Sequence, residues 1–133
     1  MPIESGLVNE TTITVTPDMT AEASNVEGMA PVLATPRLIS YLERTAHLAV
    51  WPLLEAGQST VGVLVNVRHL AATPVGMTVR FRAELVEVDR RRLVFKVEAW
   101  DEIEKIGEGT HERFIIDLQR FQGGIEKKKQ LIK

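Results

Sequence analysis

The chain has 133 residues, 44% of them hydrophobic, and a formal net charge of -2, which fits one globular domain with its own core. It contains no cysteine, which excludes disulfides, thiolate metal sites and cysteine nucleophiles, and its small net charge disfavours a nucleic-acid partner. No apolar run approaches the roughly 20 residues of a membrane-spanning helix, and no signal-peptide pattern opens the chain, so we expect a cytoplasmic protein without a membrane partner.

The first third of the chain predicts one strand followed by an irregular segment. Residues 11–16 are all β-branched, which favours an extended strand, and Pro17 ends it. Residues 18–34 show no clear periodicity. We expect them to form a loop or a short lid.

The segment that begins at Thr35 and Pro36 predicts one long helix. A threonine hydroxyl can cap free N–H groups, and proline is tolerated in the first helical turn. Pro52 is expected to kink or tighten the last turns, and Gly57 to follow the end. The apolar residues at helical spacing are Leu38, Leu42, Ala46, Ala49 and Leu53, with Ile39 and Val50 beside them.

The rest of the chain predicts a series of strands, because apolar and polar residues alternate with a period of two. Turn residues at 73–76, 89–91 and 101–102 separate these segments. In the first of them, four valines from Val61 to Val67 are expected to share one face. The predicted strands cover residues 61–68, 77–85, 92–99 and about 105–117.

This order of elements indicates an α+β protein in which an antiparallel sheet wraps around one long central helix, the hotdog fold. One such unit leaves part of the helix and a sheet edge uncovered, so we expect a homodimer. Residues 1–122 are expected to form the single domain. Residues 123–133 are rich in glycine and charge, and we expect a frayed tail.

The three histidines are candidates for proton transfer. His69 ends the valine-rich strand, where an imidazole can carry a proton or stabilise an oxyanion, or serve only as a polar end residue. His47 lies one helical turn after Glu43, so an i, i+4 pair without catalytic meaning is its default interpretation. His111 lies on the last strand, where a structural cross-strand role is at least as good an interpretation as a functional one.

Four further residues are candidates for a catalytic or binding site. Glu43 lies on the flank of the helix that faces the sheet or a partner, where a carboxylate is costly unless it is used or paired. Thr35 is about 80° away around the helix, so both can border one cavity, although Thr35 can also be a simple cap. Gly62 either admits a ligand or marks a bulge. Arg113 can hold an anionic substrate group or a surface carboxylate.

Two stretches, residues 67–79 and residues 106–113, resemble the fluoroacetyl-CoA thioesterases and their relatives in the hotdog-fold thioesterase superfamily. The resemblance extends from about residue 35 to residue 121. It implies an acyl-CoA thioesterase that acts as a homodimer, with acyl-CoA bound at the subunit interface and with no metal or organic cofactor.

The resemblance also implies roles for five residues that are retained here. Thr35, Glu43 and His69 fall on the catalytic positions, and Gly62, His69 and Arg113 on the positions that contact substrate. The backbone N–H of Gly62 is our candidate donor to an oxyanion. Glu43 is expected to act as nucleophile or as general base.

The chain departs from this family near its N-terminus. Aromatic side chains help to build a lid over the acyl pocket of the fluoroacetate enzyme, whereas residues 1–40 here contain no aromatic residue, and Arg44 follows Glu43 directly. We therefore expect a different acyl specificity. The alternatives on the same fold are a non-catalytic module that binds acyl-CoA or an acyl metabolite, and an acyl-thioester dehydratase.

Overall fold

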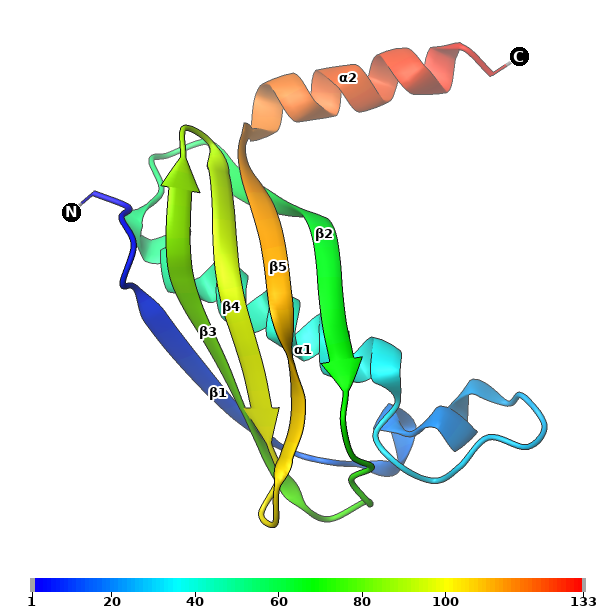
Figure 1. Cartoon of the computed structure of the whole chain (residues 1–133). Coiled ribbons are helices and arrows are strands. Elements are labelled where there is room, and N and C mark those ends of the chain that lie inside the picture. Colours follow the sequence, from blue (N-terminus) through cyan, green and yellow to red (C-terminus); the bar gives the residue numbers. More distant parts are fainter. Residues whose placement is uncertain (1, 133) are drawn as a thin grey trace.

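The computed structural model describes residues 2–132, in which a curved antiparallel sheet wraps around one long helix (Figure 1). The sheet has five strands in the order β1-β3-β4-β5-β2. The strands are β1 (Val8–Thr14), β2 (Gln58–His69), β3 (Thr78–Asp89), β4 (Arg92–Trp100) and β5 (Lys105–Asp117), and the helices are α1 (Thr35–Val50) and α2 (Leu118–Gln130). Short 3-10 helices are η1 (Pro17–Met19), η2 (Ala21–Ser24) and η3 (Trp51–Leu53).

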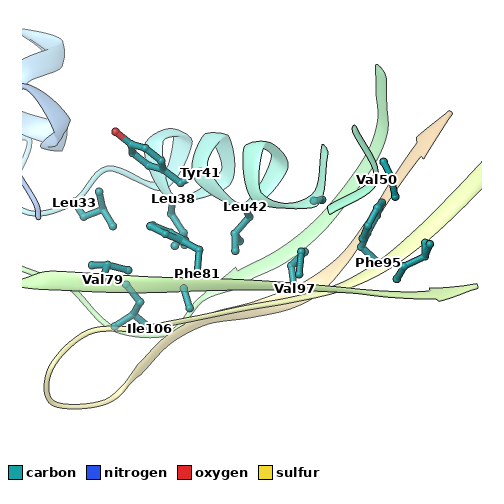
Figure 2. Packing of buried hydrophobic residues seen from close by; sticks show 14 of the residues in the cluster. Leu33, Leu38, Tyr41, Leu42, Val50, Val79, Phe81, Phe95, Val97 and Ile106 are labelled. Carbon is teal, nitrogen blue, oxygen red and sulfur yellow. The ribbon is translucent and has the colours of Figure 1, made fainter. Parts of the chain in front are cut away.

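The core lies between α1 and the concave face of the sheet (Figure 2). Alternate residues of β3 and β4 point inward, as their period of two predicts, and α1 contributes the stripe that its helical spacing predicts. Tyr41, which the apolar spacing left out, stacks on Phe81 with ring centroids 5.3 Å apart. The fully buried apolar residues include Leu38, Leu42, Ala46, Val50, Val79, Phe81, Ala83, Leu85, Leu93, Phe95, Val97 and Ala99.

Helix α1 begins where the sequence predicts, but Thr35 does not cap it. Ala34 holds the N-cap position and Thr35 is already helical, so the capping role is wrong. The Thr35 hydroxyl is instead bonded to His69, and that contact competes with capping. At the other end Pro52 lies in η3, which tightens the last turn as expected.

A β-bulge interrupts β2 between Gly62 and Leu64. Before it, Val61 pairs with an outward residue of β5, whereas after it Val65 and Val67 pair with inward ones. The prediction that all four valines share one face is therefore wrong. An unbroken period of two would also put Gly62 and His69 on opposite faces, and the extra residue brings both to the inner face.

For residues 123–133 we expected a frayed tail, whereas in the structure Gly123 to Gln130 continue helix α2. Asp117 caps this helix by accepting a hydrogen bond from the backbone N–H of Arg120. Figure 1 shows α2 extending away from the end of β5. The domain boundary at residue 122 stays a prediction. Among the residues described here, no helix is long and apolar enough to cross a membrane.

Candidate active site

Thr35 and His69 form the first cluster of candidate residues. Thr35 opens α1 and His69 ends β2, and the Thr35 Oγ1 atom lies 2.8 Å from His69 Nδ1. Both line a pocket of about 390 Å³ together with residues 32–34 and 70–72. The other ring nitrogen, His69 Nε2, is buried and has no hydrogen-bond partner in the described part of the chain.

Glu43, Gly62 and Arg113 form the second cluster. Glu43 Oε2 lies 3.5 Å from Nη1 of Arg113, and the Arg113 side chain is 9% exposed. A Cβ on Gly62 would lie 2.7 Å from that carboxylate oxygen and 3.2 Å from Arg113 Nη1. Gly62 marks a bulge, as one of its two interpretations held, and the side chains of Glu43 and Arg113 occupy the space that a larger residue would fill. That Gly62 also admits a ligand stays a prediction.

Arg113 is held from several sides. Its Nε donates to Thr60 Oγ1 at 2.8 Å and its Nη2 to the Thr60 carbonyl at 3.0 Å. Its Nη1 donates to His111 Nε2 at 3.1 Å, and His111 Nδ1 donates to the Leu64 carbonyl at 2.8 Å. His111 thus has the cross-strand structural role that was one of its two interpretations. Of the two interpretations of Arg113, the structure shows a carboxylate partner, Glu43, whose side chain is 38% exposed; contact with an anionic substrate group stays a prediction.

His47 belongs to the second cluster and does not pair with Glu43. Its Nδ1 lies 2.6 Å from Thr60 Oγ1, so the default i, i+4 interpretation is wrong. Thr60 itself was missed by the sequence analysis. It is 5% exposed, but a threonine in a β-branched strand is so ordinary that its residue type offered no signal.

The two clusters are separate within one chain. Thr35 and Glu43 are eight residues apart on α1, which is roughly 12 Å along the helix axis. Glu43 lines a different, polar pocket of about 410 Å³ with Arg44, His47, Thr60 and Arg113 among its other residues. The expectation that Thr35 and Glu43 border one cavity is not met inside a single chain.

Burial first of all lowers the pKa of His47, His69 and His111 from the ordinary histidine value of 6.5. As pH falls below that value, the unfolded chain binds protons before the folded chain, so the folded state loses stability. We expect a lower melting temperature at about pH 5.5 than at about pH 7.5. Thermal unfolding followed by circular dichroism checks this, and an equal or higher melting temperature at the lower pH would contradict it.

Residues 2–132 contain no group of three or more His, Asp or Glu side chains that are placed to hold a metal ion. The expectation that no cofactor takes part stays a prediction.

Comparison with protein families matches residues 15–119 to the fluoroacetyl-CoA-specific thioesterases, FlK. The chain is 41% identical over 97 residues to the fluoroacetyl-CoA thioesterase of Streptantibioticus cattleyicolor, an overlap that covers 73% of this chain and 70% of that enzyme. These matches agree with the family resemblance of residues 67–79 and 106–113.

Solved structures are similar over nearly the whole chain. The fluoroacetyl-CoA thioesterase FlK superposes with a TM-score of 0.91 at 33% identity, covering 96% of this chain and 98% of that one. A thioesterase superfamily member from Thermus thermophilus gives 0.89 at 30% identity, with 97% and 95% covered. A hot-dog-like protein from Thermanaerovibrio acidaminovorans gives 0.86 at 18% identity, with 93% and 91% covered. The expected hotdog fold is confirmed.

Proposed function

The chain belongs to the family of fluoroacetyl-CoA-specific thioesterases, and from this premise we propose how its own residues carry out hydrolysis. It is an acyl-CoA thioesterase, which cleaves a thioester to a free acid and coenzyme A. The observation that carries the proposed site is the space at Gly62, where the Glu43 carboxylate lies beside Arg113. Its cytoplasmic location remains a prediction.

We propose that two copies of the chain associate through β2, one of the two edge strands of the sheet. Its central residues Val63, Leu64 and Val65 are 51%, 44% and 42% exposed. An edge strand also presents unpaired N–H and C=O groups to a second chain. A two-fold interface joins the same patch of both copies. Antiparallel pairing of β2 with its copy would cover the apolar run and continue the sheet.

The proposed pairing also joins the two clusters of candidate residues. Because the paired strands run in opposite directions, the His69 end of one β2 points toward the other half of its copy, which begins at Gln58 and contains Gly62. The partner's Thr35 and the partner's His69 then approach Glu43 and Gly62. We therefore propose that acyl-CoA binds at the subunit interface and that each site draws on both chains.

The chemistry follows from the hydrogen bonds of the first cluster. When the Thr35 hydroxyl donates to His69 Nδ1, the imidazole proton is on Nε2 and is available to the thioester carbonyl or to the departing sulfur. Glu43 acts as base for a water molecule or attacks as nucleophile. In the direct route Glu43 takes a proton from water, the water oxygen forms the C–O bond to the carbonyl carbon, the C–S bond breaks and the sulfur of coenzyme A takes the Nε2 proton to leave as a thiol. In the nucleophilic route a Glu43 oxygen forms the C–O bond while coenzyme A leaves in the same way, and water then hydrolyses the resulting mixed anhydride to the free acid and the Glu43 carboxylate. The Gly62 N–H is the proposed second donor to the oxyanion.

Residues 18–34 are proposed to be the lid of the Thr35–His69 pocket. The bridge between Thr20 and Leu33 closes the segment, and its outer part exposes Val26 and Met29 by 55% and 46%. No aromatic residue occurs in it. Because aliphatic side chains shape this lid, we propose an acyl group other than fluoroacetyl.

Thiol release from a panel of acyl-CoAs tests the function. We expect turnover of at least one ester among acetyl-, short-chain, branched, aromatic and halogenated acyl-CoAs, with fluoroacetyl-CoA not the best substrate. Binding of these esters without thiol release would instead support the non-catalytic module. Formation of an enoyl- or hydroxyacyl-CoA with the thioester intact would support the dehydratase.

A further inference from the structure

His47 is a half-buried group that the proposed mechanism does not use. It lies on α1, one turn after Glu43, and contacts a hydroxyl that is already bonded to Arg113. His47 Nδ1 is 2.6 Å from Thr60 Oγ1, and Arg113 Nε donates to the same oxygen at 2.8 Å. His47 and Arg113 thus meet on a single buried hydroxyl.

The directions of these hydrogen bonds follow from the groups involved. A guanidinium only donates, so Thr60 Oγ1 must accept from Arg113 Nε. The hydroxyl proton is then available to His47 Nδ1, its one hydrogen-bond acceptor among the described residues, and this donation pairs every polar group if Nδ1 carries a lone pair. We assign the neutral imidazole with its proton on Nε2 from this network.

The cation that faces His47 from another strand favours the same neutral form. Arg113 faces it from β5, and Arg44 and the oppositely charged Glu43 line the same pocket from its own helix. The remaining neighbours are uncharged: Thr60 from β2, and Trp51, whose ring centroid lies 5.4 Å away. Burial and the Arg113 charge both lower the pKa of His47.

The Arg113 guanidinium connects Thr60 with the Glu43 carboxylate. Thr60 holds two of the three guanidinium nitrogens, Nε through its hydroxyl and Nη2 through its carbonyl. The third nitrogen, Nη1, lies between His111 Nε2 at 3.1 Å and Glu43 Oε2 at 3.5 Å. A rotation of the guanidinium therefore moves the charge that orients the Glu43 carboxylate.

We propose that His47 is a positioning residue for hydrolysis, acting through Thr60 and Arg113 on Glu43, and that it does so only while its imidazole is neutral. This rests on the proposed function of Glu43. A protonated His47 carries a donor on Nδ1, so the Thr60 hydroxyl faces two donors and loses its own acceptor. Two cations then lie on either side of one hydroxyl, and the Arg113 position is disturbed.

The test compares two variants at His47 of different hydrogen-bonding ability. In His47→Asn the amide oxygen can accept from Thr60 but does not titrate, so we expect most of kcat to be retained near neutral pH and one acid ionisation to vanish from the pH profile of kcat. In His47→Leu no acceptor remains, and we expect kcat to fall roughly 10-fold where the wild-type His47 is neutral, with the difference from the wild type shrinking as the pH falls and the wild-type His47 is protonated. Equal kcat and an unchanged pH profile in both variants would overturn the proposal.

A matched pair at Thr60 extends this test. Thr60→Ser keeps the hydroxyl and should keep most of kcat, whereas Thr60→Val keeps the shape and should lose at least as much as His47→Leu. A Thr60→Val variant that is folded by circular dichroism and has the kcat of Thr60→Ser would overturn the proposal.

A readout without substrate separates this proposal from the proposed function. In 15N spectra of the wild-type protein near neutral pH, His47 Nδ1 should show the shift of an unprotonated nitrogen, and Thr60→Val should change that shift. A proton found on Nδ1 would overturn the proposal even if thiol release is normal. If no acyl-CoA is hydrolysed but the spectra are as expected, the hydrogen-bond network stands and the proposed function fails.

Discussion

Replacing Glu43 by glutamine is expected to lower kcat for acyl-CoA hydrolysis by at least about 100-fold, the usual scale for the loss of an acid–base or nucleophilic group. Glutamine has the same shape, so it still fits the space that Gly62 leaves. It has no negative charge, however, and can neither attack the carbonyl, activate a water molecule nor pair with Arg113 as a carboxylate. Release of coenzyme A, followed with a disulfide reagent, measures the loss.

The same assay applied to His69→Ala should show a loss of similar size, because the proton donor to the carbonyl or sulfur is gone. Thr35 supplies a matched control, since Thr35→Ser keeps the hydroxyl that lies 2.8 Å from His69 Nδ1 in the wild type. We expect Thr35→Ser to keep most of kcat and Thr35→Val to lose activity. A fully active protein with both Glu43→Ala and His69→Ala would rule out the proposed chemistry.

Gly62→Ala is the second change with a large expected effect. The new Cβ would lie 2.7 Å from Glu43 Oε2, 3.2 Å from Arg113 Nη1 and 3.2 Å from His111 Cε1. The carboxylate is the end of a flexible side chain, so it should move while the strand stays in place. Because a displacement near 1 Å can cost about 100-fold in rate, we expect kcat to fall roughly 10- to 100-fold.

Gly123→Ala is the matched control for this substitution, because no atom lies within 4 Å of a Cβ built on Gly123. It should leave kcat unchanged. The melting temperature of Gly62→Ala should stay close to that of the wild type, which distinguishes a moved carboxylate from a damaged sheet. Wild-type kcat in Gly62→Ala would show that the Glu43 position is not critical.

The parts of the fold that could be predicted are those in which one local pattern decides burial. Phe81 and Phe95 are fully buried because each lies at an inward position within a stretch of its strand that alternates regularly. Helix α1 was predicted for the same reason, since Leu38, Leu42 and Ala46 recur on the face that packs on the sheet.

Contacts between distant residues account for what the sequence analysis missed. A capping preference is local and worth about 1 kcal/mol, so the Thr35 hydroxyl could be taken by His69, which lies 34 positions away. A helical Glu43–His47 pair is also weak, and His47 forms a hydrogen bond with Thr60 instead. The bulge after Gly62 adds one residue to a regular run of valines, and the glycine was its only signal.

The C-terminal helix shows how composition can mislead. Glycines and lysines in residues 123–133 favoured a frayed tail, yet Asp117 caps the helix, and Leu118, Phe121 and Ile125 recur at helical spacing. For the site, chemistry alone left every candidate with a structural alternative. The family resemblance selected the five residues, and the structure then showed that they fall into two clusters.

The central claim is that each active site combines Glu43 of one chain with the partner's His69. Co-expression of Glu43→Gln and His69→Ala chains with different affinity tags allows the mixed dimer to be purified. One of its two sites then has both wild-type residues, so we predict about half the wild-type kcat per dimer, although each variant alone is nearly inactive. A mixed dimer as inactive as its parents would contradict the claim.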